Sequence, residues 1–219
     1  MKRNKEVTSY PADIAWGAAV AAQRTNGAYL KVAEYLPNTD TVGRRPNKEI
    51  MFELLKTPEQ IPEADRAQGL EVRKHLTNSV TMQALRRELN DFQRTMADIC
   101  QLDQVSGAYN LAVLASLPGS FERQQAQEQT QSRLARTDNT TVGAINAKVQ
   151  LNVEVLESRY SQKWATYYVT AIDVANRALF FAHRSALPAG KHLAIQGTVK
   201  RHTDASTQLN RVRVLSERI

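Results

Sequence analysis

The chain has 219 residues, 42% of them apolar, and its 29 Lys or Arg exceed its 22 Asp or Glu to give a net charge of +7. That length allows one large domain or two small ones, with enough apolar residues for a packed core. No run of about 18 apolar residues occurs, which argues against a transmembrane helix. The first ten residues lack the apolar segment of a secretory signal. The single cysteine, Cys100, excludes a disulfide framework and a CxxC metal site, so we expect a protein of the reducing cytoplasm.

The positive charge is unevenly distributed along the chain. From Asn146 onward there are 11 Lys or Arg against 5 Asp or Glu, whereas the preceding residues are nearly balanced. A basic excess confined to one module is typical of binding to a polyanion such as nucleic acid. The alternative is a solvated face that charge keeps soluble.

In the first 120 residues, apolar side chains recur at intervals of three and four, which predicts an α-helical domain of about five helices. The first helix is expected to begin at Pro11, and Asn26-Gly27 either interrupts or ends it. The period continues from Tyr29 to Leu36, beyond which Pro37 is expected to stop the helix. Asn47 is the expected N-cap of a short second helix.

Two longer helical stretches follow in the same domain. One begins at Pro62-Glu63 and contains Gly69, which we regard as a weak point of the helix. The next region carries the apolar stripe from Val80 to Ile99, and we expect the thiol of Cys100 there to be buried and inert. A last apolar cluster ends at Pro118-Gly119. Most apolar residues of these stripes are interpreted as ordinary core.

The segment 121–145 separates this domain from the rest. Its first part is rich in Gln and has few large apolar groups, so it is either a solvated helix or a linker. Its second part is rich in turn-forming residues and marks the boundary. We therefore divide the chain into residues 1–120, 121–145 and 146–219.

After residue 146 the hydrophobic period changes to two, which predicts β-strands. The strands are expected around residues 149–155, 164–174 and 177–181, followed by a hairpin over residues 193–215. In the last strand the alternation slips by one residue between Leu209 and Val212, which suggests a β-bulge near Asn210. Five short strands joined by turns are typical of a Greek-key barrel of the OB type. The predicted fold class is therefore α+β, with a helical domain followed by an OB-type barrel.

Several short motifs in residues 140–215 resemble OB-fold modules of bacteriophage replication and recombination proteins. Those modules often end in a G-T-V-K-x-H strand and a T-x-L-x-R strand, which here match Gly197 to His202 and Thr207 to Arg211. The resemblance also includes Val142-Gly143, Tyr168-Val169, Asp173, Asn176, Leu187 and Gly190. It departs from the pattern where a glycine after Val142-Gly143 is replaced by Ile145 or Asn146, and where the segment before the fourth strand is too short for a helix. The resemblance implies an OB fold in a phage protein.

An OB barrel binds its ligand across the second and third strands, between the loops that follow the first and fourth strands. Proteins that bind single strands combine cationic groups for the phosphates with flat rings for the bases. We expect Arg159, Tyr160 and Lys163 in the first loop, and Trp164 on one face of the second strand with Tyr168. The expected nucleic-acid-binding residues are Arg159, Tyr160, Lys163, Trp164, Tyr168, Arg177, Lys200, Arg201, His202, Arg211 and Arg213.

Each of these residues also has a structural interpretation. One of Tyr167 and Tyr168, and one of Phe180 and Phe181, must belong to the core of a barrel of this size. Arg211 and Arg213 are also typical of a charged edge strand that prevents aggregation. His202 is better explained as a turn or surface residue than as a ligand.

The sequence contains no motif of a known catalytic or metal site: no GxxxxGK[ST], GxGxxG or HExxH pattern and no Cys/His cluster. We therefore expect no enzyme activity, no cofactor and no bound metal. The predicted function is non-catalytic, sequence-independent binding of single-stranded DNA in phage DNA replication or transcription. The alternatives are an adaptor for a polymerase, helicase or recombinase, an RNA-binding protein, and a nuclease. The helical domain is expected either to form a homo-oligomer or to dock such a partner protein.

Overall fold

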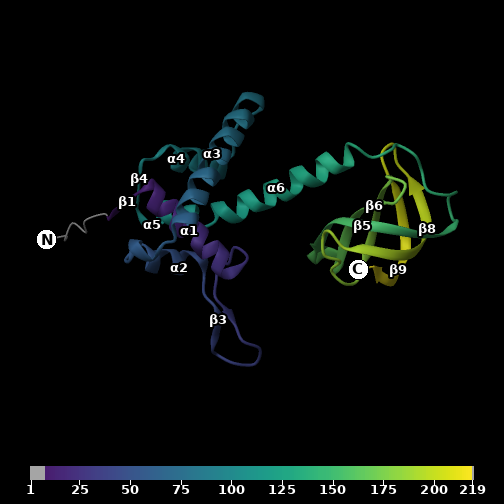
Figure 1. The fold of residues 1–219 in the computed structure, drawn as a ribbon, viewed down its shortest axis with the longest axis horizontal. Helices are drawn as coiled ribbons and strands as arrows, with labels where there is room; N and C mark the ends of the chain where they lie inside the picture. The colour runs from purple at the N-terminus through teal and green to yellow at the C-terminus, as the bar shows by residue number, and fades with distance from the viewer. Residues whose placement is uncertain (1–7, 219) are drawn as a thin grey trace. The chain divides into compact units, whose positions relative to one another are not determined.

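The computed structural model describes residues 8–218 of the chain (Figure 1). Contacts divide it into two compact units, Met1–Gln125 and Ala126–Ile219, which we call the helical unit and the barrel unit. The division falls inside the segment 121–145 that the sequence marks as a boundary. The combination of helices with a closed five-stranded barrel confirms the α+β class.

From residue 8 onward, the helical unit contains five helices, the start of a sixth and two small antiparallel sheets, in which β1 pairs with β4 and β2 with β3. None of the helices in the part of the chain that the structure describes is long and apolar enough to cross a membrane. The elements are β1 (Ser9–Pro11), α1 (Ala12–Asn26), β2 (Glu34–Tyr35), β3 (Val42–Arg44), α2 (Asn47–Leu54), the 3₁₀ turn η1 (Pro58–Gln60), α3 (Glu63–Arg86), α4 (Asp91–Gln101), β4 (Gln104–Ser106), α5 (Ala108–Leu114) and α6 (Leu117–Leu134).

The core of the helical unit is built around α1, whose alanines and Trp16 are buried. Small side chains let a second helix approach closely, and α3 does so at Gly69. A Cβ atom added to Gly69 would lie 2.7 Å from the backbone carbon of Trp16. Gly69 is therefore a packing contact between α1 and α3, and α3 runs through it without a break.

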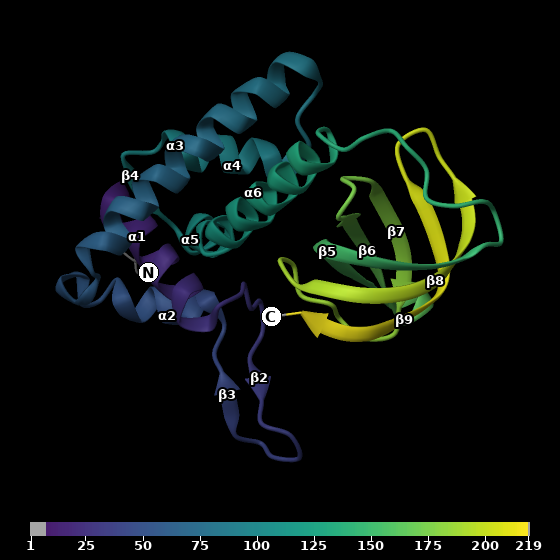
Figure 2. The same cartoon turned by 45° about the vertical axis from the view of Figure 1, so that its right-hand side comes forward.

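The first predicted helix is shorter than expected. Gly27 has a left-handed φ of 65° and its N–H donates to the carbonyl oxygen of Gln23, which ends α1 at Asn26. The prediction that the helix continues from Tyr29 to Leu36 is wrong, because this stretch leads into β2 of a short hairpin with β3. The hairpin projects from the helical unit (Figure 2).

The N-cap of α2 is Pro46, and not Asn47 as was predicted. The side chain of Asn47 is buried instead, where Oδ1 accepts hydrogen bonds from the backbone N–H of Leu30 at 2.9 Å and from Nδ2 of Asn26 at 2.8 Å. A buried amide needs such partners. Asn47 therefore joins the end of α1 to the chain that enters α2.

Two further features of the helical stretch are decided locally. The apolar stripe from Val80 to Ile99 is split between α3 and α4, because Asn90 and Gln93 form a capping box that starts a new helix. The Gln-rich segment forms most of α6, so it is a helix rather than a linker.

Cys100 is buried as expected, and desolvation raises the pKa of its thiol to about 11.

The barrel unit consists of five strands in the order β5-β6-β7-β9-β8, closed by pairing of β8 with β5. All neighbours are antiparallel except β7 and β9, which are parallel. This arrangement is consistent with the predicted OB-type barrel. The elements are β5 (Lys148–Ser161), the 3₁₀ turn η2 (Gln162–Trp164), β6 (Thr166–Asp173), β7 (Ala178–His183), β8 (His192–His202) and β9 (Thr207–Arg218).

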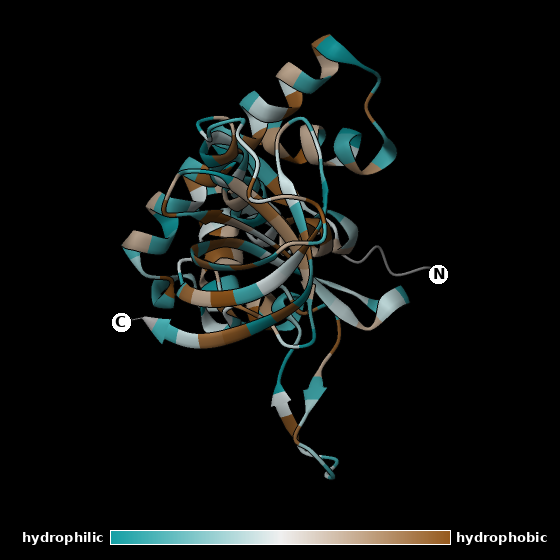
Figure 3. Cartoon of the chain, turned by 90° about the vertical axis from the view of Figure 1, so that its right-hand side faces the viewer, coloured by the Kyte–Doolittle hydropathy of each residue, from teal (hydrophilic) through white to brown (hydrophobic). Residues whose placement is uncertain are grey.

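Alternation along the strands separates the inside of the barrel from its outer surface, and in Figure 3 brown and teal residues follow one another along them. Phe181 is buried in the barrel core, whereas Phe180 is only partly buried. The predicted bulge is confirmed: Thr198 pairs with Asn210 but Gln196 pairs with Arg213, which leaves Arg211 and Val212 opposite the single residue Gly197. The inward residues are Val153, Val155, Val169, Ala171, Leu179, Phe181, Leu193, Ile195, Val199 and Leu209.

We predict that Gly69→Ala destabilises the helical unit by about 1–3 kcal/mol, because the added methyl group overpacks the contact with Trp16. In an exposed helix the same change would be favourable by up to about 1 kcal/mol. Urea unfolding followed by helical circular dichroism measures the difference. Gln68→Ala, at an exposed neighbouring position, is the control and should change stability by less than about 0.5 kcal/mol. An increase in stability for Gly69→Ala would contradict the close approach of α1 and α3.

Candidate nucleic-acid interface

Two aromatic rings lie together on the outer surface of β6 and β7. Tyr168 alternates with the buried Val169, and Phe180 with the buried Phe181, so both rings point away from the core. The strand register pairs Tyr168 with Ala182 and Thr170 with Phe180, which makes the two aromatic residues diagonal neighbours. Their ring centroids are 5.6 Å apart with an angle of 15° between the planes, a stacked arrangement. The barrel thus presents a flat aromatic surface on its second and third strands.

Cationic side chains lie on both sides of this aromatic pair. On one side Arg159 of β5 is directly opposite Tyr168, and its guanidinium is bonded to Glu157 at 2.8 Å. On the other side Gln208 of β9 is opposite Phe180, and Arg201 of β8 donates to Oε1 of Gln208 at 2.6 Å. Five strands therefore carry one continuous band in the order Arg159, Tyr168, Phe180, Gln208 and Arg201. We call these five residues the outer band.

The turn between β5 and β6 adds a third ring with its own cation. Trp164 is 63% exposed, and Nζ of Lys163 lies 5.1 Å from the centroid of its ring. The prediction that Trp164 shares a strand face with Tyr168 is wrong: it belongs to η2, and Ala165 with a left-handed φ of 44° separates it from β6. Its exposure leaves the ring open to a ligand.

Two residues predicted for the first loop lie in strand β5 instead. Arg159 and Tyr160 belong to its last residues, because β5 pairs with β6 as far as Ser161. Tyr160 is 52% exposed and its ring centroid lies 5.0 Å from that of Tyr167. Tyr160 and Tyr167 thus form a second aromatic pair near the end of these strands.

A basic hollow of about 650 Å³ lies between the end of β7 and the bulged part of β9. Arg211 and Arg213 line it, together with Arg184, which follows β7 directly. No Asp or Glu is among its lining residues. The remaining lining residues are Thr166, Ala182, His183, Ser185 and Val212.

The other predicted residues have different surroundings. Arg177 precedes β7 and donates from Nε and Nη2 to one carboxylate oxygen of Asp173, at 2.8 and 2.6 Å. The carboxylate of Asp173 is buried, so the partly exposed Arg177 is held by a buried partner. Lys200 is exposed at a bulge of β8, which shifts the alternation and places His202 opposite Thr207. Nδ1 of His202 lies 3.2 Å from the buried hydroxyl of Thr207.

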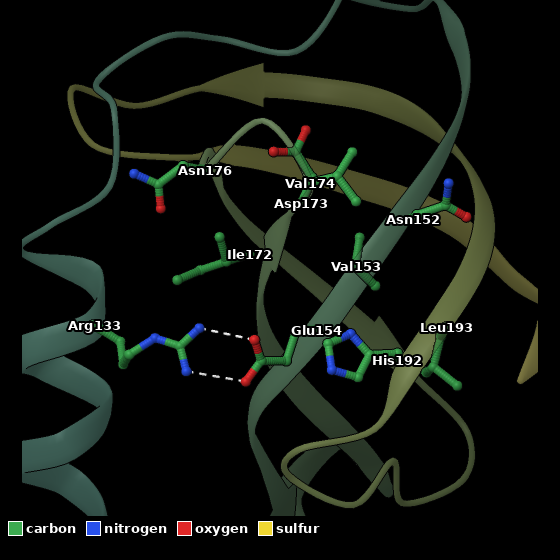
Figure 4. Close-up of a pocket in the computed structure, with 10 residues that line it drawn as sticks. All are labelled: Arg133, Asn152, Val153, Glu154, Ile172, Asp173, Val174, Asn176, His192 and Leu193. Atoms are coloured by element: carbon green, nitrogen blue, oxygen red, sulfur yellow. Dashed lines mark hydrogen bonds and ion pairs between the residues drawn. The ribbon is translucent and has the colours of Figure 1, made fainter. Parts of the chain in front are cut away.

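A second pocket, of about 440 Å³, lies in the barrel unit beside the start of β5 (Figure 4). Arg133 of α6 donates to both carboxylate oxygens of Glu154, at 3.0 and 2.8 Å. This hydrogen-bonded ion pair lowers the pKa of Glu154, with a smaller contribution from His192. Nδ2 of Asn176 donates to the carbonyl oxygen of Arg136 at 2.8 Å. These contacts fasten the end of α6 and the following segment to the barrel.

The residues that the structure describes contain no group of three or more His, Cys, Asp or Glu side chains placed to hold a metal ion. The chemistry that the outer band offers is aromatic stacking and charge neutralisation. Both are properties of a binding surface.

Sequence reasoning left the choice between Phe180 and Phe181 open, and it missed Arg184 of the basic hollow. Phe181 pairs with the buried Val169 and lies two residues after the buried Leu179, so it points inward and Phe180 points outward. The pairing of these strands could not be read from the sequence. Arg184 lies in the segment after the third strand, and only its position in the hollow connects it with Arg211 and Arg213.

No protein-family model, no curated protein and no solved structure matches this chain.

We predict that the contribution of Glu154 to stability depends on pH. Because the folded state lowers the pKa of Glu154, its contribution is present above the pKa of the unfolded chain and is lost as the pH falls through the folded value. Glu154→Gln should therefore lower the free energy of unfolding at neutral pH, and the difference from wild type should vanish in acid. Urea titrations at several pH values measure this. Glu157→Gln, in the more exposed pair with Arg159, is the control and should have a small effect. A difference that is independent of pH would contradict the role of the ion pair.

Proposed function

We propose that the barrel unit binds single-stranded DNA without catalysis and without sequence preference. The observation that carries this proposal is the stacked pair of Tyr168 and Phe180, which faces outward on β6 and β7 between Arg159 and Arg201. In an OB-type barrel the second and third strands form the ligand surface. Here these strands are β6 and β7.

The chemistry of the outer band fits an unpaired strand. Each base offers a flat face to an aromatic ring, and such a contact contributes about 1–3 kcal/mol whatever the base. The guanidinium groups of Arg159 and Arg201 neutralise phosphates, and the released counterions make affinity depend on salt. In a duplex the bases are stacked on each other, so the rings favour a single strand.

The turn after β5 extends this surface. Trp164 supplies a further exposed ring and Lys163 a further charge, and the two lie close together. Tyr160 and Lys200 are exposed in the same unit and remain proposed contacts. Arg177 is left out, because Asp173 already binds its guanidinium.

The setting of this function, phage DNA replication or transcription, rests on the sequence resemblance. The proposed roles of the helical unit are self-association or docking of a polymerase, helicase or recombinase. Self-association would place several barrels on one strand and raise avidity without a new contact.

We predict that Phe180→Ala weakens the binding of a fluorescent thymidine 20-mer by about 5- to 150-fold, the equivalent of about 1–3 kcal/mol for one lost stacking contact. Tyr168→Ala should have a similar effect. Fluorescence anisotropy at several salt concentrations gives the dissociation constants. Phe180→Leu tests the ring while keeping most of the packing, and circular dichroism shows whether each variant is folded.

Tyr35→Ala is the matched control, because Tyr35 is an exposed aromatic residue of the helical unit, outside the proposed surface. Its affinity should equal that of wild type. Failure of the wild type to bind at low salt would overturn the proposal in favour of an adaptor. Tighter binding of a matched uridine strand would favour RNA, and cleavage of the strand with Mg²⁺ or Mn²⁺ would favour a nuclease.

A further inference from the structure

The basic hollow arises where two parallel strands separate. β7 and β9 pair only from Leu179 with Thr207 to Phe181 with Leu209. Beyond this point β9 contains the bulge at Arg211 and Val212 and follows β8, while β7 ends at His183. The space between them is the hollow lined by Arg184, Arg211 and Arg213.

These three arginines differ from others of the barrel unit. Arg133, Arg159, Arg177 and Arg201 each donate to a side-chain oxygen of Glu154, Glu157, Asp173 or Gln208. Within residues 8–218, no side-chain hydrogen bond or ion pair joins Arg184, Arg211 or Arg213 to another residue. Three like charges around one hollow repel each other, and an anion placed between them would remove this cost.

The backbone at Arg211 provides a second and independent observation. Its φ is 52°, in the left-handed region that Gly and Asn adopt more easily than Arg. A residue held there costs about 1–3 kcal/mol, and such residues gather at ligand sites. The bulge directs the Arg211 side chain toward the hollow at the expense of local strain.

We propose that the basic hollow is a phosphate-binding subsite, which takes one phosphate group of the strand bound on the outer band. Three guanidinium groups match the oxygens of a phosphate, because each can donate two parallel hydrogen bonds. Ala182, which lines the hollow, is directly opposite Tyr168 in the sheet. The phosphate site therefore adjoins the ring on which a base stacks.

This inference rests on the proposed function, and it leaves two sources of the phosphate. One is a terminal phosphomonoester, and the other is an internal phosphodiester of the chain. Both offer the same oxygens, but the monoester carries more charge. A comparison of strands with a 5′-phosphate and with a 5′-hydroxyl distinguishes them.

The test measures how binding of a thymidine 20-mer depends on salt for the wild type and for the Arg211→Gln, Arg213→Gln double variant. Loss of the single phosphate held in the hollow should reduce the slope of log K against log salt by about 0.7, since each phosphate neutralised on a single strand contributes about 0.7. Lys191→Gln is the control, because it removes one exposed charge that pairs with Glu217, away from the hollow. Its slope should remain that of wild type.

A second variant keeps the test valid if the double variant fails to fold. Arg211→Asn removes the charge but suits the left-handed backbone, so its melting temperature should equal or exceed that of wild type while its affinity falls. If a 5′-phosphate tightens binding of the wild type but not of this variant, the subsite takes a terminal phosphate. If both strands lose affinity equally, it takes an internal one.

Two results would overturn the subsite, and both can be separated from failure of the proposed function. The first is a wild-type slope and affinity in the double variant while Phe180→Ala still weakens binding. The second comes from an NMR titration without any oligonucleotide. If the subsite exists, adding inorganic phosphate to the isotope-labelled protein should shift the side-chain Nε–Hε signals of Arg211 and Arg213 more than that of Arg159. Unchanged Arg211 and Arg213 signals would reject the subsite even if the protein binds DNA.

Discussion

Closure of the barrel through the short parallel pairing of β7 with β9 is the constraint on which the rest of this unit depends. It joins Leu179, Phe180 and Phe181 to Thr207, Gln208 and Leu209. Closure gives the sheet an inside and an outside, so Phe181 enters the core and Phe180 stays on the surface. Because the pairing stops after three residues, it also creates the basic hollow at the point where the strands separate.

The cationic residues of the barrel unit have unlike roles. The turn at Asp173 binds Arg177, and the pocket at the start of β5 binds Arg133, so both arginines stabilise the structure. The arginines of the outer band are bonded but solvent-exposed, and those of the hollow lack a partner among the described residues. Net charge alone cannot make these distinctions, because a guanidinium held by a buried carboxylate is not available to a phosphate, whereas a solvent-exposed one is.

The helical unit shows how tertiary contacts override local signals. Asn47 is a residue type that favours the N-cap position. Its side chain turns inward instead, because it accepts hydrogen bonds from Asn26 at the end of α1 and from the N–H of Leu30. Glycine normally weakens a helix, yet Gly69 allows α3 to approach Trp16 closely. In both cases a partner distant in the sequence decides the role.

The sequence by itself determined the number and place of the barrel strands, most of the helices, the boundary segment and the bulge after Leu209, because periodicity and turn chemistry are local properties. Tertiary structure decided that Tyr168 stacks on Phe180, that Trp164 stands outside the strand, that Asp173 binds Arg177 and that Arg184 joins Arg211 and Arg213. These outcomes depend on strand register and on barrel closure. Both arise from hydrogen bonds between strands that are separated in the chain, and no window of neighbouring residues contains that information.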